Sequence, residues 1–344
     1  MYKIGIIGCG KIAQVRHIPE YMANSNTELA GFYDLRQDRA QELATKFGVK
    51  AYDSYEAMLK DPSIDAVSVC SANHTHASIT IEALRAGKHV LCEKPMAITL
   101  EECEEMVRVA KEEERFLMIG HNQRLTKAHR RARQLIEEGS IGDIISFRTT
   151  FGHKGPETWS IDPGKNIWFF DKDLARLGAV GDLGIHKTDV IQFLTGQKIT
   201  EVMAKIVTLD KKDATGNLIG VDDNAISIYT MENGIVGTMT ASWTYYGKED
   251  NATVLYGTKG IMHIYDDPTY SITITTKEGE NIYYEIDKIQ TNDHQTASGV
   301  IDLFAQCLVT QESQENSGEQ ALAAMKAVFA SVESSRTGKA VKIK

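Results

Sequence analysis

The chain begins with a short apolar strand that runs directly into a glycine turn. Residues 3–7 read Lys-Ile-Gly-Ile-Ile, and the turn Gly8-Cys9-Gly10 separates them from a helix predicted over residues 11–22. Short apolar runs of this kind are typical of strands that are buried on both faces of a parallel sheet. The alternation of buried strand and helix continues to about residue 120. A regular βαβ alternation of this length predicts a parallel sheet with helices on both faces.

The other elements of this first half follow the same pattern. Gly48 and Gly87 each follow a predicted helix, and glycine commonly ends a helix at its C-terminus. The further predicted strands cover residues 29–33, 49–52, 66–70, 89–92 and 116–120, and the further helices cover residues 39–47, 54–60, 76–86 and 100–114. We therefore expect an α/β domain over residues 1–121.

Beyond residue 121 the pattern changes to longer strands with turn signals between them. Asn233-Gly234 and Lys259-Gly260 are dipeptides of the kind that join antiparallel strands. The predicted strands cover residues 141–151, 225–230, 235–241, 253–256, 260–264 and 271–275, and the predicted helices cover residues 127–138, 184–195, 294–309 and 320–334. Residues 122–344 are therefore expected to form an α+β domain with an antiparallel or mixed sheet.

The composition excludes several classes of protein. With 42% hydrophobic and 25% charged residues, the chain matches the globular average and is neither disordered nor fibrous. Its net charge of −9 offers no basic surface, so we expect no nucleic-acid or membrane partner. No apolar run approaches the roughly 18 residues of a membrane helix. Because the first strand leaves no room for an export signal, a cytoplasmic protein is expected.

The cysteines and histidines indicate neither a disulfide framework nor a metal site. The cysteine count is odd and no CxxC spacing occurs, so reduced and mostly buried thiols are expected. These cysteines are Cys9, Cys70, Cys92, Cys103 and Cys307. His74 and His76 are two residues apart, but they lack a third ligand at a fixed spacing. We therefore predict no metal.

The first glycine cluster, Gly8-x-Gly10-x-x-Ala13, predicts a dinucleotide-binding turn. Gly8 permits a tight turn, Gly10 lets the backbone approach a pyrophosphate, and Ala13 lets the helix pack close to the strand. The N-terminus of the helix offers N–H groups and a partial positive charge to phosphates. The turn residues predicted to bind the cofactor are Gly8, Cys9, Gly10, Lys11 and Ile12.

Asp34 ends the second strand and favours NAD over NADP. A carboxylate at this position accepts hydrogen bonds from both ribose hydroxyls and repels a 2′-phosphate. Arg36 lies two residues further on and could stack on the adenine or meet a phosphate. NADP is therefore the less favoured alternative.

Three separated segments resemble the Gfo/Idh/MocA family, named after glucose–fructose oxidoreductase, inositol dehydrogenase and rhizopine catabolism. They are similar to the family patterns N-x-x-H, A-G-K-H-V-x-x-E-K-P and G-x-x-x-D-x-G-x-H-x-x-D. In this chain they lie at residues 73–76, 86–95 and 178–189. The resemblance implies an N-terminal Rossmann domain and a C-terminal domain with a large, mostly antiparallel open sheet. It also implies a homodimer or homotetramer formed through the outer face of that sheet.

The resemblance implies that Lys94, Asp182 and His186 are catalytic, and their own chemistry agrees. A lysine at the C-terminal end of a parallel strand can stabilise a developing alkoxide. Residues four apart in a helix share one face, so the aspartate could orient the histidine, which would accept a hydroxyl proton. Asp189 is expected to contact the other nitrogen of this histidine. Alternatively, Asp182 only caps the helix and His186 only packs in a domain interface. Pro95 is expected to follow a cis peptide bond.

Further cofactor and substrate residues are expected in loops. The resemblance places Ser71, Ala72, Asn73, His76, Glu93, Lys94 and Asn122 near the cofactor, and Arg124 near the nicotinamide or the substrate. Aromatic rings in the loop over residues 152–170 could stack on the apolar face of a sugar ring. The predicted substrate residues are Lys94, His153, Asn166, Trp168, Asp182 and His186. Alternatively, the aromatic residues form a hydrophobic plug under a long loop.

These features together predict an NAD-dependent dehydrogenase that oxidises a secondary hydroxyl of a cyclic polyol or sugar, as an inositol 2-dehydrogenase does. Two alternatives are an NAD-dependent glycosidase on the same scaffold, which would oxidise its substrate only transiently, and a non-catalytic NAD-binding regulator. The presence of Lys94, Asp182 and His186 argues against the regulator.

Overall fold

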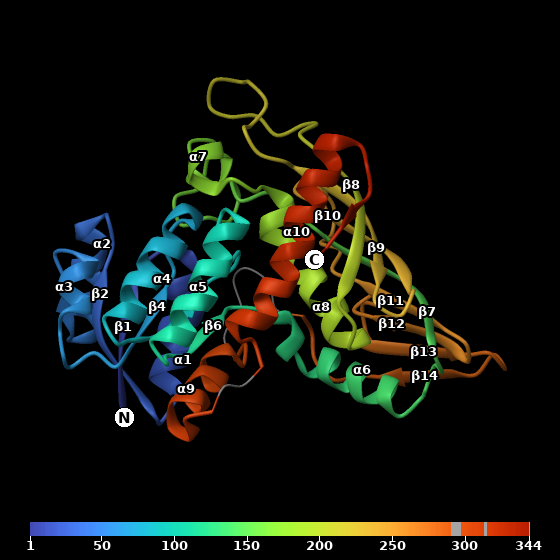
Figure 1. The fold of residues 1–344 in the computed structure, drawn as a ribbon, viewed down its shortest axis with the longest axis horizontal. Coiled ribbons are helices and arrows are strands. Elements are labelled where there is room, and N and C mark those ends of the chain that lie inside the picture. The colour runs from blue at the N-terminus through green and yellow to red at the C-terminus, as the bar shows by residue number, and fades with distance from the viewer. Residues whose placement is uncertain (290–296, 313–314, 344) are drawn as a thin grey trace. The chain divides into compact units, whose positions relative to one another are not determined.

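The computed structural model describes residues 1–289, 297–312 and 315–343, and over these ranges the chain forms two compact units. The first unit comprises Met1–His121, Ser160–Asp162 and the described residues of Gln290–Leu322. The second comprises Asn122–Trp159, Pro163–Ile289 and the described residues of Ala323–Lys344. The two units are coloured by residue number in Figure 1.

The described residues of the first unit form a six-stranded, fully parallel sheet in the order β3-β2-β1-β4-β5-β6. Its strands are β1 (Tyr2–Ile7), β2 (Thr27–Tyr33), β3 (Lys50–Ala51), β4 (Ala66–Val69), β5 (His89–Cys92) and β6 (Leu117–Ile119). The predicted α/β architecture is therefore confirmed. The strand order reverses between β1 and β4, and open α/β sheets bind ligands beyond the carboxyl ends of the strands at such a point.

The helices of the first unit follow the predicted boundaries closely. They are α1 (Ile18–Ala23), α2 (Gln37–Phe47), α3 (Tyr55–Leu59), α4 (His76–Arg85) and α5 (Leu100–Glu112), and a π-helical turn (Ala13–His17) precedes α1. Local sequence explains several ends. Gly48 ends α2 with φ of 68°, and Thr99 with Glu102 forms a capping box at the start of α5.

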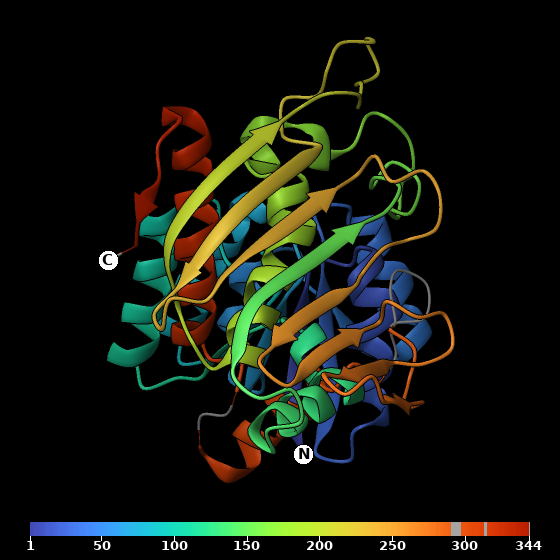
Figure 2. The ribbon, with the colours of Figure 1, turned by 90° about the vertical axis from the view of Figure 1, so that its right-hand side faces the viewer.

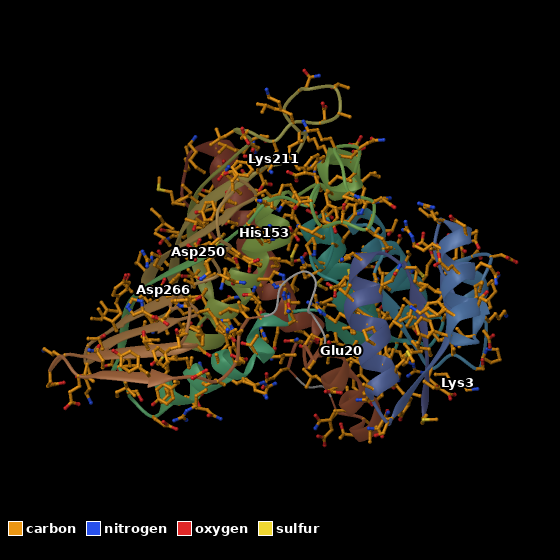
Figure 3. The ribbon with its side chains drawn as sticks, turned by 180° about the vertical axis from the view of Figure 1, so that it is seen from behind. Lys3, Glu20, His153, Lys211, Asp250 and Asp266 are labelled. Atoms are coloured by element: carbon orange, nitrogen blue, oxygen red, sulfur yellow. The ribbon has the colours of Figure 1, made fainter. Side chains whose placement is uncertain are left out.

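Helix α9 (Val300–Thr310) was expected in the second domain, but it belongs to the first unit. It lies beside α1 (Figure 1). The Glu20 carboxylate, labelled in Figure 3, accepts hydrogen bonds from the backbone N–H and the hydroxyl of Ser298, each at 2.9 Å. The Asn24 side chain donates to Asp302 at 2.7 Å. These long-range contacts, which periodicity cannot reveal, fasten the segment to the first unit.

The described residues of the second unit form a nine-stranded sheet in the order β14-β13-β12-β11-β7-β10-β9-β8-β15. All of these pairs are antiparallel except β10 with β7, so the predicted mostly antiparallel sheet is confirmed. Its strands are β7 (Ile144–Gly152), β8 (Ile199–Val207), β9 (Asn224–Met231), β10 (Val236–Ser242), β11 (Thr253–Gly257), β12 (Gly260–Ile264), β13 (Ile272–Thr276), β14 (Asn281–Tyr284) and β15 (Val341–Lys342). Strands β8, β14 and β15 were not predicted.

Helices cover one face of this sheet and leave the other open (Figure 2). They are α6 (Lys127–Glu137), α8 (Ile185–Thr195) and the later part of α10 (Gly318–Thr337), while the short α7 (Lys172–Ala175) lies in a loop. No helix among the described residues is long and apolar enough to cross a membrane.

All five cysteines are buried thiols, as expected. Burial, with a smaller effect of the Asp34 charge, raises the pKa of Cys9 to about 12.

Candidate functional site

The turn after β1 has the geometry that a dinucleotide requires. Gly8 has φ of +92°, and a Cβ atom there would lie 2.6 Å from the backbone of Cys70 and Ser71, so only glycine fits. A Cβ atom on Gly10 would meet no described atom within 4 Å, so open space lies beside this part of the turn. Ala13 is fully buried where the helix meets the sheet. The close approach and the adjoining open space fit a pyrophosphate group.

Asp34 is held beside this turn by two backbone groups. Its Oδ2 accepts the N–H of Cys9 at 2.7 Å, and its Oδ1 accepts the N–H of Arg36 at 2.8 Å. A carboxylate oxygen can accept more than one hydrogen bond, so both oxygens retain capacity for ribose hydroxyls. The first unit therefore fits NAD at both the phosphate and the ribose positions.

Glu93, at the end of β5, is the centre of a buried polar network. Its Oε1 lies 2.9 Å from Nε2 of His17 and 3.3 Å from Nη1 of Arg16. Its Oε2 accepts the backbone N–H of Lys94 at 3.1 Å. Burial acts to raise the pKa of Glu93, but the His17 hydrogen bond and the Arg16 charge outweigh it and lower this pKa to about 2. The carboxylate is therefore ionised and positions the backbone of Lys94.

Ser68 and Tyr21 extend this network from His17. Nδ1 of His17 lies 3.2 Å from the hydroxyl of Ser68, which lies 2.7 Å from the hydroxyl of Tyr21. Arg16, His17, Ser68 and Tyr21 are all buried, and none was predicted as a site residue. The only feature of the sequence that could have indicated this network is the pair of basic residues Arg16-His17, which lies in a helix expected to pack on the sheet.

The Lys94–Pro95 peptide bond is cis, as expected. His76 ties this segment to the loop after β4, because its Nδ1 lies 2.8 Å from the Pro95 carbonyl and its Nε2 lies 3.0 Å from the Ser71 carbonyl. Burial lowers the pKa of His76 despite these two carbonyls. The His76 side chain is 1% exposed, and both of its ring nitrogens lie against main-chain carbonyls.

In the second unit, Asp182 lies in a π-helical turn (Val180–Gly184) that leads directly into α8, which carries His186. The indole N–H of Trp243 donates to Oδ2 of Asp182 at 3.0 Å. Asp182 does not cap this helix. The N-cap positions of the π-helical turn and of α8 are Ala179 and Gly184. At the start of the turn, the N–H groups of Gly178 and Val180 donate to the two carboxylate oxygens of Asp222 at 2.7 Å each. The capping alternative for Asp182 is therefore wrong.

Asp222 was not predicted from the sequence. Burial raises its pKa to about 6, although the two backbone N–H groups act in the opposite direction. Gly178 packs so closely against Asp222 that a Cβ atom would lie 1.8 Å from its carbonyl oxygen. This glycine of the third family pattern is therefore required by the close approach of two loops.

Asp189 forms a buried two-point ion pair with Arg124, a partner that was not predicted. The Nε of Arg124 donates to Oδ2 at 2.8 Å, and its Nη2 donates to Oδ1. The guanidinium also lies 5.6 Å from the ring centre of Phe193. Within the second unit this pair holds the segment after Asn122 against α8.

Aromatic rings extend from His186 into the loop over residues 152–170. Phe151 lies between the rings of His186 and His153, at centroid distances of 5.9 and 5.4 Å. His153, labelled in Figure 3, lies 6.3 Å from Trp159. Trp159 lies 5.3 Å from Phe169, which stacks on Trp168 at 3.8 Å.

Of the predicted substrate residues in this loop, His153 and Trp168 belong to one aromatic series, whereas Asn166 is exposed. Trp159 and Phe169, which complete the series, are aromatic residues of the predicted substrate loop but were not among the predicted substrate residues. Lys211, also labelled in Figure 3, forms an ion pair with Glu157 of the same loop.

Lys187, beside His186, is fully buried. Its Nζ donates to the Asn251 carbonyl at 2.8 Å and lies 6.0 Å from the ring centre of Phe151. Burial lowers its pKa to about 7, although Asp250 and Glu249 act to raise it. A charged amine in this place opposes folding.

We expect Lys187→Met to raise the free energy of unfolding at pH 7 by about 1–4 kcal/mol, because an apolar side chain replaces a buried charge. Between pH 7 and the ordinary lysine pKa, the unfolded parent binds more protons than the folded parent, so parental stability rises with pH in this window. The difference in unfolding free energy between variant and parent should therefore become smaller from pH 7 to pH 9. Urea unfolding measures this difference, with the exposed Lys198→Met as control. A difference that does not change with pH would contradict the lowered pKa of Lys187.

Among the described residues, no group of three or more His, Cys, Asp or Glu side chains is placed to hold a metal ion.

Comparison with known proteins assigns both parts of the chain to one family. Residues 2–121 match the model described as "Oxidoreductase family, NAD-binding Rossmann fold", and residues 129–263 match the GFO/IDH/MocA C-terminal domain. Levoglucosan dehydrogenase of Pseudarthrobacter phenanthrenivorans is 34% identical over 263 residues, which cover 71% of this chain and 64% of that enzyme. Myo-inositol 2-dehydrogenase of Thermotoga maritima is 27% identical, with coverage of 81% and 79%.

The solved structures agree. Levoglucosan dehydrogenase in complex with NADH and levoglucosan superposes with a TM-score of 0.86 and 25% identity, over 99% of both chains. The predicted family, Rossmann domain and NAD-binding role are thus confirmed. This chain belongs to the Gfo/Idh/MocA family of oxidoreductases and carries its NAD-binding Rossmann domain.

Proposed function

We propose that this chain oxidises a secondary hydroxyl of a ring-shaped sugar or cyclic polyol with NAD, and that Lys94, Asp182 and His186 act together on the substrate oxygen. The observation that carries the proposal is the contact of Trp243 with Asp182. This indole N–H fixes one oxygen of the Asp182 carboxylate, four residues before His186, and residues four apart in a helix share one face. The relatives named for levoglucosan and myo-inositol support the substrate class.

The residues that would hold the cofactor are those of the turn after β1, with Asp34 at the ribose and Glu93 behind Lys94. When bound, NAD supplies the hydride acceptor. Its fit depends on the open space beside Gly10 and on the two fixed oxygens of Asp34.

The chain's own residues handle the proton and the oxygen. His186 accepts the proton of the substrate hydroxyl, and we assign this step to Nε2 because Nδ1 is buried. Asp182 stabilises the imidazolium that results. Lys94 donates a hydrogen bond to the substrate oxygen as its negative charge develops.

The aromatic series from Phe151 to Trp168 supports a substrate with an apolar ring face, such as a pyranose or an inositol. Relatives are named for levoglucosan, glucoside and inositol oxidation, so the series by itself does not select among these.

A screen for NADH absorbance across inositols, aldoses, anhydrosugars and glycosides tests the proposal. NADH formation with a free sugar or polyol supports it. Release of an aglycone without net NADH would instead show the glycosidase. NADH binding without turnover of any compound would show the regulator.

We also propose that the open face of the nine-stranded sheet joins copies of this chain. Met203, Ile226, Ile228 and Val236 are 43–57% exposed, whereas their strand neighbours Val202, Ser227 and Tyr229 are buried. Met203 pairs directly with Ile228 across β8 and β9, so these two side chains share one face of the sheet. An apolar group of this kind is typical of an interface.

We expect the double variant Ile226→Asp/Ile228→Asp to weaken self-association by roughly two orders of magnitude or more, because two carboxylates would be buried in the interface. Sedimentation equilibrium of parent and variant measures the association. Leu209→Asp, at an exposed residue outside the strands, is the matched control. A monomeric parent, or a variant that associates like the parent, would contradict the proposed interface.

A further inference from the structure

Two arginines and three carboxylates meet beside the ribose position of the first unit. Nη2 of Arg36 lies 2.7 Å from Oδ2 of Asp38, and its Nη1 lies 3.6 Å from Oδ1 of Asp162. Nη2 of Arg39 lies 2.7 Å from Oδ2 of the same Asp162. Asp34 contacts the backbone N–H of Arg36. Asp162 is far along the chain from these residues, yet it belongs to the first unit.

This arrangement bears on coenzyme choice. Enzymes that use NADP commonly place an arginine near the ribose, where it meets the 2′-phosphate. Arg36 and Arg39 follow Asp34 closely enough to serve in this way. In the structure, however, Asp162 contacts both guanidinium groups and Asp38 contacts one of them.

We propose that Asp162, by pairing with Arg36 and Arg39, is a determinant of the preference for NAD over NADP. The inference rests on the proposed use of a dinucleotide by this chain. With Asp34 and Asp38 included, three carboxylates face two guanidinium groups, so the local net charge is −1. A 2′-phosphate entering this place would face repulsion and would also have to compete with Asp162 for each arginine.

Asp162 is a better target for substitution than Asp38. Asp38 lies in the first turn of α2, where a carboxylate also stabilises the N-terminus of the helix. Asp162 lies in a loop, and its side chain is 62% exposed. Because Arg36 is also exposed, its ion pairs contribute little to folding, and Asp162→Asn should leave the fold intact.

The test measures equilibrium binding, which needs no knowledge of the substrate. NADH and NADPH are titrated by fluorescence against the parent and Asp162→Asn. We expect the Kd of NADPH to fall by about 3–10-fold and the Kd of NADH to change by less than about 2-fold, since one surface charge is removed and two arginines are released. Added salt should reduce the difference between parent and variant, because exposed charges are screened.

Two further variants separate the mechanism from a general charge effect. Asp173→Asn makes the same charge change at another exposed carboxylate of the described chain and should leave both Kd values unchanged. In a background with Arg36→Gln and Arg39→Gln, Asp162→Asn should no longer improve NADPH binding by more than about 2-fold, because no arginine is left to release.

The possible results are distinct. An unchanged Kd of NADPH in Asp162→Asn, an equal change for both coenzymes, or a full effect in the background without the arginines would each overturn the role of Asp162. If the parent binds neither NADH nor NADPH, the proposed function itself fails.

Discussion

Replacing His186 by alanine is expected to lower kcat by roughly 10²–10⁴-fold, the usual contribution of a general base. The ring lies at the start of α8, beside a helical turn whose Asp182 is oriented by Trp243. Without the imidazole, the substrate hydroxyl must lose its proton to water or hydroxide. The residual rate of the variant should therefore rise with pH over a range in which the parental rate is level.

The binding of NADH should separate this role from a structural one. The residues that fit the cofactor, the turn after β1 and Asp34, lie in the first unit, whereas His186 lies in the second. We therefore expect the Kd of NADH to be unchanged in His186→Ala. His263→Ala, at a partly exposed histidine of β12, should retain full turnover. Full turnover in His186→Ala would remove this residue from the mechanism.

Replacing Glu93 by glutamine is expected to lower the free energy of unfolding at pH 7 by about 3–5 kcal/mol, the cost of breaking a buried ion pair. The carboxylate faces His17 and Arg16, and all three side chains are at most 5% exposed. A neutral amide cannot balance the guanidinium charge, and it has one acceptor oxygen where the carboxylate has two.

The pH dependence of this effect follows from the lowered pKa of Glu93. Its folded pKa of about 2 is below the ordinary 4.5, so the carboxylate contributes stability that is fully present above pH 4.5. This contribution is lost as the pH falls toward 2. Urea unfolding at pH 7 and pH 3 should therefore show a large gap between parent and variant at pH 7 and a smaller gap at pH 3.

The exposed Glu42→Gln on α2 provides the matched control, because it removes the same charge without a buried partner. A loss of stability below about 1 kcal/mol in Glu93→Gln would show that the network does not depend on the ion pair. If the difference in unfolding free energy between parent and variant is the same at both pH values, the pKa of Glu93 is not lowered in the folded protein.

Much of the fold could be read from local patterns. The apolar strands, the glycines after helices and the turn Gly8-Cys9-Gly10 act over a few residues, and their predicted boundaries agree with the structure to within a few positions. Strand β8 was missed because its burial pattern is irregular, with only Ile199 and Val202 buried. Helix α9 was predicted as a helix but was assigned to the wrong unit, because periodicity shows that a face is buried but not which surface buries it.

The candidate site also has one part that the sequence predicts and another that it does not. The types and spacing of Asp34, Lys94, Asp182 and His186 indicate chemistry without reference to their neighbours. Their partners are distant in sequence. Trp243 is 61 positions from Asp182, and His17 is 76 positions from Glu93. No local signal connects such pairs, since each contact depends on how strands and helices pack.

The sequence by itself determined the order of strands and helices in the first unit and the nucleotide-binding turn, and it supplied the residues that we propose as catalytic. These properties follow from side-chain chemistry and from backbone preferences that act over one turn or one strand. Only the tertiary structure decided that Asp222 binds the backbone at the start of the helical turn before α8, that Glu93 is held ionised by His17 and Arg16, and that Asp162 pairs with the arginines after Asp34. Each of these depends on charges and hydrogen-bonding groups that meet only when distant segments pack together and exclude water.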